Sequence, residues 1–225
     1  MATQEQSQHK SGSGTSVNDT YLSTPTSGNV LITAISIDKN SGTITIPSGW
    51  TVIGATYVSG SVSGAWAYKI SDGTEGTVTW NWATTQFDVV MWLAEYSGID
   101  TLDVQASADS GASSVTSQSS GTTGTTDIAT AHAFAIFGVD TFDNVDGGRT
   151  YSNSFTEIDA RALDSPGLMI AEKVLSATGT QECTYATTDG GDQMFGKISV
   201  FNLAAGGGGS TFQAAWAMNS NVVIQ

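Results

Sequence analysis

The stretch Val78-Thr79-Trp80-Asn81-Trp82 alternates strictly between apolar and polar residues. This period of two places both tryptophans on one face of a strand and Thr79 and Asn81 on the other, as a half-buried antiparallel strand requires. Other apolar or alternating runs, separated by Gly, Ser, Asn and Asp clusters, recur on both sides of it. This pattern predicts an all-β protein, either a sandwich or a barrel.

The runs fall into two groups of five predicted strands, about ten in all. The second group looks like a copy of the first, because Ala67-Tyr68-Lys69-Ile70 aligns with Ala171-Glu172-Lys173-Val174, and Trp50-Thr51-Val52-Ile53 aligns with Phe155-Thr156-Glu157-Ile158. The offset between aligned residues stays at about 102 to 105 throughout, which favours an internal duplication over chance similarity in a low-complexity sequence. The predicted strands are 30–37, 50–58, 65–70, 78–82 and 89–96, then 131–139, 155–162, 168–175, 183–186 and 195–203.

A five-strand unit with one apolar face per strand is most simply satisfied when its two copies share a core. We therefore expect one jelly-roll-like antiparallel β-sandwich over residues 21–204. The Ser/Thr/Gly-rich segment 107–126 is interpreted as a long surface crossover; a linker between two domains is the alternative.

Both ends of the chain differ from the middle. Residues 1–20 are polar, and we expect an extended N-terminal arm that burial cannot order in an isolated monomer. Residues 205–225 begin with a Gly-rich hinge, which resembles an engineered linker. The apolar residues after the hinge favour a native tether with a docking tail. The predicted partner-binding residues of this tail are Phe212, Trp216, Met218, Val222 and Ile224.

Composition excludes several classes of function. Charged residues make up only 12% of the chain, and 7 basic against 21 acidic residues give a net charge of −14. This charge repels phosphate backbones and anionic bilayers, so neither a nucleic-acid partner nor a membrane partner is expected. The chain has no apolar run long enough for a membrane span or for a secretory signal peptide. We therefore expect synthesis in a cytoplasm, without export through a signal peptide.

The sequence carries no recognisable catalytic signature, and we predict that the protein is not an enzyme. Cys183 is the single cysteine, which rules out an intrachain disulfide. His132 opens an apolar run and is interpreted as a satisfied histidine at a strand end, while His9 lies in the polar arm. Glu95 and Glu172 lie in predicted strands, but nothing places two carboxylates at the separation that glycoside hydrolysis needs.

Calcium is the most plausible small ligand. Asp140, Asp143 and Asp146 crowd one loop that ends in Gly147-Gly148, and calcium prefers hard oxygen ligands on such turns. The competing and favoured interpretation is that Asp and Gly are here the ordinary turn residues of a β protein. No other cofactor is expected.

Six tryptophans invite a carbohydrate-binding hypothesis, because sugar rings stack on exposed aromatic faces. Most of them lie in predicted strands, where large aromatic side chains usually form the core of a sandwich. Trp216 differs, since it follows the glycine hinge and is expected to anchor the tail in a partner or in the body of its own chain.

Several runs resemble Ser/Thr/Gly-rich jelly-roll proteins that are encoded in phage genomes. The resemblance rests on Pro47-Ser48-Gly49-Trp50-Thr51, on the run from Ala67 to Glu75, on Val78-Thr79-Trp80 and on Glu95-Tyr96-Ser97-Gly98, and it covers about 30–203. It implies a virion component without catalytic residues, such as a capsid decoration protein or a fibre module. A major capsid protein or another virion protein is then the expected partner, and the virion, assembled in the host cytoplasm, is the expected location.

The leading functional hypothesis is a decoration protein that binds the outside of the assembled capsid and stabilises it, by mass action. A homo-oligomer is expected, and a trimer is favoured. The alternative is a carbohydrate-binding or host-adhesion module, which requires two or more tryptophans exposed on one concave surface. A glycan-active enzyme is the third hypothesis and requires a cleft with two facing carboxylates.

Overall fold

The computed structural model describes residues 2–127, 130–140, 148–161, 166–188 and 190–204, and this part of the chain is all-β. The first half contains β1 (Thr3–Thr20), β2 (Val30–Asp38), β3 (Ile44–Thr45), β4 (Thr51–Val52), β5 (Tyr57–Val58), β6 (Val62–Ile70) and β7 (Thr77–Ser97). The second half contains β8 (Ile99–Asp109), β9 (Ser117–Ser119), β10 (Ala131–Val139), β11 (Thr150–Tyr151), β12 (Thr156–Arg161), β13 (Gly167–Val174), β14 (Thr184–Ala186) and β15 (Met194–Leu203).

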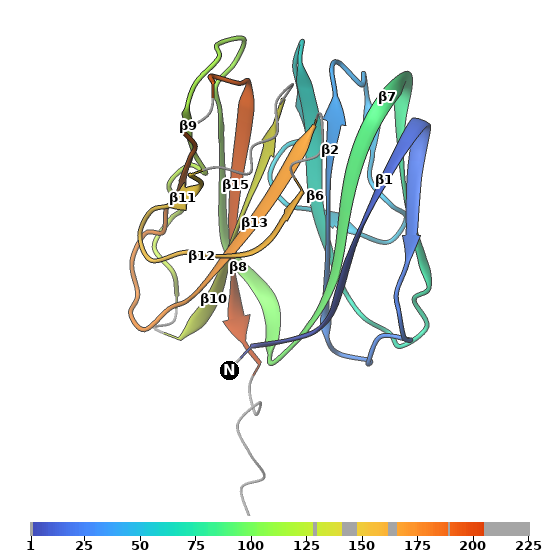
Figure 1. Cartoon of the computed structure of the whole chain (residues 1–225). Helices are drawn as coiled ribbons and strands as arrows, with labels where there is room; N and C mark the ends of the chain where they lie inside the picture. Colours follow the sequence, from blue (N-terminus) through green and yellow to red (C-terminus); the bar gives the residue numbers. More distant parts are fainter. Residues whose placement is uncertain (1, 128–129, 141–147, 162–165, 189, 205–225) are drawn as a thin grey trace, which may run out of the picture.

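Two antiparallel sheets pack face to face, and the predicted β-sandwich is confirmed (Figure 1). One sheet has the order β1-β7-β2-β6-β4, with β3 on β7 and β5 on β6; the other has the order β12-β13-β10-β15-β8. Each sheet comes from one half of the chain. The second half also forms a small sheet of order β11-β14-β9.

The register of the strands supports the internal duplication. Counted along each half, the five strands of both main paths have the same order, since β1, β7, β2, β6 and β4 correspond to β8, β15, β10, β13 and β12. Thr51 pairs with Tyr68 in the first half, and their aligned counterparts Thr156 and Glu172 pair in the second. Ile35 likewise pairs with Ala65, as Phe137 pairs with Met169. The two halves are therefore structural copies.

The long strands of the first copy are divided in the second. β7 pairs with β1 and also with β3, as β14 pairs with β9 and with β11. β14 and β15 thus correspond to two parts of β7, while β8 and β9 correspond to two parts of β1. The predicted strands 78–82 and 89–96 are accordingly one strand of 21 residues, and register shifts around Gly14 let its partner β1 follow it.

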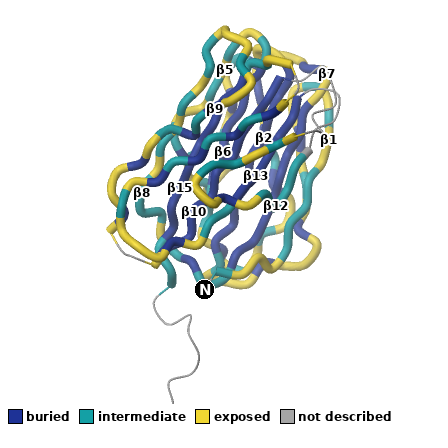
Figure 2. Tube along the Cα trace, turned by 60° about the vertical axis from the view of Figure 1, so that its left-hand side comes forward, coloured by how far each residue is buried: buried dark blue, intermediate teal, exposed yellow. Residues whose placement is uncertain are grey.

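In the described residues, apolar side chains form three clusters: one between the main sheets and one inside each copy. Because both of its faces are covered, β2 is buried along its whole length, as is β10 (Figure 2). This double coverage explains why the sequences of these strands are nearly continuous apolar runs rather than alternating ones. Trp66, Trp92, Phe134 and Phe201 are large members of the cluster between the sheets.

The structure differs from the sequence predictions in the N-terminal segment and in the segment that follows β7. Residues 3–20, expected as an arm that its own chain does not order, form the edge strand β1 and pair with β7. Backbone hydrogen bonds and the burial of Val17 hold this polar segment, which a composition rule based on apolar side chains misses. The strand β8 was not predicted, and the segment 107–126 starts inside β8 and includes β9.

Candidate functional site

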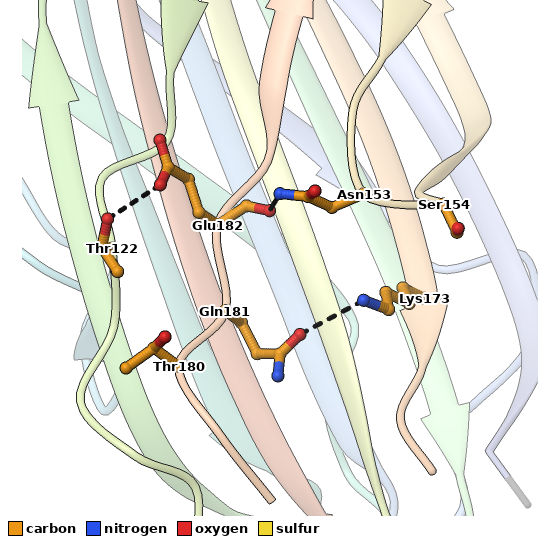
Figure 3. A pocket seen from close by; sticks show the side chains of 7 residues that line it. All are labelled: Thr122, Asn153, Ser154, Lys173, Thr180, Gln181 and Glu182. Carbon is orange, nitrogen blue, oxygen red and sulfur yellow. Dashed lines mark hydrogen bonds between the residues drawn. The ribbon is translucent and has the colours of Figure 1, made fainter. Parts of the chain in front are cut away.

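A polar pocket of about 460 Å³ opens on the surface of the second copy, and we call it the Lys173 pocket. Its residues come from the end of β13 and from three connecting segments that meet there (Figure 3). A second hollow of about 520 Å³ adjoins it and shares Ser154 and Lys173. The lining residues of the Lys173 pocket are Thr122, Asn153, Ser154, Lys173, Thr180, Gln181 and Glu182.

A tight turn between β11 and β12 builds one wall of the pocket. Asn153 and Ser154 have φ angles of 56° and 63°, and the backbone N–H of Phe155 donates to the carbonyl of Ser152 at 3.2 Å. Two successive residues with positive φ define a type I′ turn, which favours asparagine. Asn153 Nδ2 donates to the carbonyl of Glu182 at 2.8 Å, so the turn is tied to the opposite wall.

A cation and a carboxylate line different sides of the pocket. Lys173 Nζ donates to Gln181 Oε1 at 3.4 Å and lies 5.7 Å from the centre of the Phe155 ring. The Glu182 carboxylate accepts hydrogen bonds from Ser119 Oγ at 2.8 Å and from Thr122 Oγ1 at 2.9 Å. Both charged groups are thus held in place while they border open space.

The counterpart of Lys173 in the first copy is neutralised. Lys69 Nζ lies 2.8 Å from Glu75 Oε1 and 3.3 Å from Asp72 Oδ2. Burial opposes ionisation of Glu75, but hydrogen bonds from Lys69, Ser71 and backbone N–H groups outweigh it and hold the pKa of this carboxyl at about 2. In the described part of the chain, Lys173 has no carboxylate within ion-pair distance.

A second polar cluster joins the two main sheets. His132 Nε2 lies 3.0 Å from Glu172 Oε2, to which the Tyr96 hydroxyl donates at 3.3 Å. His9 Nδ1 of β1 lies 3.4 Å from Asp159 Oδ2 of β12, so both histidines of the chain contact carboxylates of the second copy. His132 is satisfied only in part, because its buried Nδ1 has no hydrogen-bond partner. Burial and the Glu172 charge raise the pKa of Tyr96. These contacts connect the sheets.

The two strand carboxylates considered for glycosidase chemistry do not share a cleft. Glu95 is buried and accepts hydrogen bonds from the Thr26 backbone N–H at 2.8 Å, from Asn29 Nδ2 at 2.6 Å and from Gln6 Nε2 at 2.5 Å. Its neighbours in β7 face the other sheet, so Glu95 lies on the opposite face of the strand. Glu172, by contrast, points into the junction between the sheets. Glu95 therefore anchors β1 and the segment after it.

The predicted calcium loop is described only at its start. Asp140 is buried, and its backbone N–H donates to the carbonyl of Gln193 at 2.9 Å. Asp143 and Asp146 lie outside the described residues, as do the tail residues Phe212, Trp216, Met218, Val222 and Ile224. Among the described residues, no three His, Cys, Asp or Glu side chains gather in a way that could hold a metal ion.

The tryptophans of the described residues belong to the core. Trp66, Trp80, Trp82 and Trp92 are buried, and Trp50 is half-buried and packs on the cluster inside the first copy. Trp216 lies outside the described residues. This part of the chain thus offers no pair of exposed tryptophans on which sugar rings could stack.

The Lys173 pocket could not be predicted from one residue type, although the sequence held a signal for it. Lys69 and Lys173 align, but Ser176 stands where the first copy has Asp72, and Thr178 precedes a glycine as Glu75 does.

Within the described residues, no helix is long and apolar enough to cross a membrane. Comparison of the chain with protein-family models, curated proteins and solved structures found no match.

Proposed function

We propose that the protein is a structural component of a bacteriophage virion, and specifically a capsid decoration protein that binds the outside of the assembled capsid and stabilises it. The observation that carries the proposal is that the first and last described residues of the sandwich lie together. Thr3 pairs with Ser97, and the Ala204 backbone N–H donates to the carbonyl of Gly98 at 3.0 Å, so the residues near both ends of the body lie together (Figure 1).

This arrangement suits a body that is fastened at one end. The residues 205–225 follow directly from that end and carry the apolar side chains that we propose as anchors in a major capsid protein or another virion protein. The opposite end of the sandwich then points away from the particle. The edge strand β1, which pairs with β7 alone among the described strands, is a further surface for strand pairing between subunits.

The composition and packing of the body support the same function. A sandwich with three apolar clusters resists deformation, and its acidic, charge-poor and hydroxyl-rich sequence suits a protein on the outer face of a particle. A protein that binds only the assembled lattice stabilises it by mass action, and a trimer would match a three-fold axis. The host-adhesion alternative requires two or more exposed tryptophans, and the described residues contain no such pair.

Co-sedimentation with undecorated capsids tests the proposal. The full chain should sediment with capsids of the phage that encodes it, and the double variant Phe212→Ala/Trp216→Ala should bind at least tenfold more weakly. A matched variant of an exposed aromatic residue of the body, Phe87→Ala, should bind like the unmodified chain. Absence of capsid binding by the full chain would refute the proposed function, and equal binding by all three proteins would remove the tail from the mechanism.

A further inference from the structure

We propose that the Lys173 pocket binds a saccharide that carries a carboxylate. The proposal rests neither on the residues 205–225 nor on the tryptophans. It rests on the difference between the two copies at one equivalent position. In the first copy the lysine is closed by its own acidic loop, whereas in the second copy the same lysine opens into a pocket.

The cation of the site is available for a ligand. Lys173 Nζ carries three donors, and its one hydrogen bond to a described residue is the long contact of 3.4 Å to Gln181 Oε1. The Lys173 ammonium group also lies 5.7 Å from the centre of the Phe155 ring, a cation–π contact that helps to position it without an ion pair. A ligand carboxylate at Lys173 would take the place that Glu75 and Asp72 occupy beside Lys69.

The rest of the lining matches hydroxyl groups. Glu182 uses one hydrogen bond at each carboxylate oxygen and keeps further acceptor sites, while Asn153 uses its amide nitrogen and leaves its Oδ1 as an acceptor. Thr180 and Ser154 add hydroxyls that donate and accept, and the Thr122 hydroxyl, which already donates to Glu182, adds an acceptor. Such mixed donors and acceptors fit a polyhydroxylated ring better than an apolar ligand. The volume of about 460 Å³ is within the usual range for small-molecule sites.

The charges of the site limit the ligand to few negative groups. Glu182 borders the Lys173 pocket and Glu172 borders the adjoining hollow, so a polyanion would meet repulsion on both sides of Lys173. The net charge of −14 opposes approach of a highly charged chain as well. One carboxylate on an otherwise neutral sugar satisfies the lysine without placing a second charge beside the glutamates. An acidic monosaccharide residue within a glycan has this chemistry.

Saturation-transfer-difference NMR and calorimetric titration of the full chain test the proposal. The probes are sodium D-glucuronate, D-glucose and sodium acetate. Glucuronate should bind more tightly than glucose, because glucose lacks the carboxylate, and more tightly than acetate, which lacks the hydroxyls. Equal binding of acetate and glucuronate would overturn the saccharide specificity, and equal binding of glucose would overturn the role of the lysine.

Variants locate the site. Lys173→Met removes the charge and keeps an unbranched apolar side chain, so it should weaken glucuronate binding at least tenfold. Its matched control, Lys69→Met, changes the equivalent residue of the first copy and should bind glucuronate like the unmodified protein. Ser176→Asp introduces the carboxylate that the first copy has at Asp72 and should weaken binding while keeping the lysine. Unchanged glucuronate affinity of Lys173→Met would refute the site.

Separate control measurements follow the folding and the capsid binding of the variants. Each variant should keep the far-ultraviolet spectrum and the buried-tryptophan fluorescence of the unmodified chain, because none of the substituted side chains is buried. Lys173→Met should also co-sediment with capsids as the unmodified chain does. Loss of glucuronate binding with intact capsid binding supports the pocket, and a failure of capsid binding in all proteins refutes the proposed function alone.

Discussion

Replacing Lys197 by methionine should stabilise the protein at neutral pH. Lys197 lies in β15, is only 2% exposed and donates through Nζ to the carbonyl of Ala55 in the first copy. Desolvation lowers its pKa from 10.5 to about 8, and the charge of Asp109 offsets only part of this effect. The aligned position of the first copy holds the buried Trp92, so an apolar side chain suits this layer.

The size of the effect follows from the pKa of Lys197 in the two states. A pKa that falls from 10.5 to about 8 on folding corresponds to a penalty of about 3 kcal/mol when the amine is charged in both states. Methionine removes this penalty but leaves the Ala55 carbonyl without its donor, which costs about 1–3 kcal/mol. We therefore expect Lys197→Met to raise the free energy of unfolding by about 1–2 kcal/mol at pH 7.

The dependence on pH is the sharper test. Between pH 8 and 10.5 the unfolded chain binds more protons at residue 197 than the folded chain does, so the contribution of Lys197 to the stability of the unmodified protein should rise with pH in this window. Lys197→Met should lack this rise, whereas the exposed Lys10→Met should keep it. Urea unfolding followed by tryptophan fluorescence from pH 7 to 9.5 measures both. An equal rise in Lys197→Met and the unmodified protein would refute the reasoning.

Three further predictions concern single contacts. Gly138→Ala places a Cβ 2.1 Å from Phe195 Cε1, so thermal unfolding should show that the free energy of unfolding falls by about 2 kcal/mol or more. The double variant Gly138→Ala/Phe195→Leu, which removes the clashing ring, should recover part of this loss. Glu75→Gln should lower stability at pH 7 and flatten the loss of stability from pH 4.5 to 2, because the unmodified carboxylate, whose pKa is about 2, stabilises the fold above this window; acid titration by circular dichroism checks it. Burial raises the pKa of Cys183 to about 12, so this thiol should react with a disulfide reagent at pH 8 only at the rate of unfolding, and rapid labelling of the folded protein would contradict this.

The sequence predicted the parts of the fold in which apolar side chains repeat. The alternation at 78–82, the doubly covered run at 30–37 and the aligned blocks of the two copies indicated strands, core and duplication, because burial selects side chains position by position. β1 escaped prediction because its order comes from backbone hydrogen bonds, which leave little trace in side-chain composition. The candidate site escaped for a different reason, since it depends on how one lysine and three connecting segments meet.

The repeated architecture has a consequence for how the protein can change. In a symmetric pair of separate chains, every substitution at the dyad would occur twice, and a residue that suits one side would be forced on the other. Joining both copies in one polypeptide removes this constraint, as the different residues at positions 92 and 197 illustrate. One copy can keep its lysine in ion pairs that only stabilise the fold, while the other copy can expose the equivalent lysine and evolve a separate binding function.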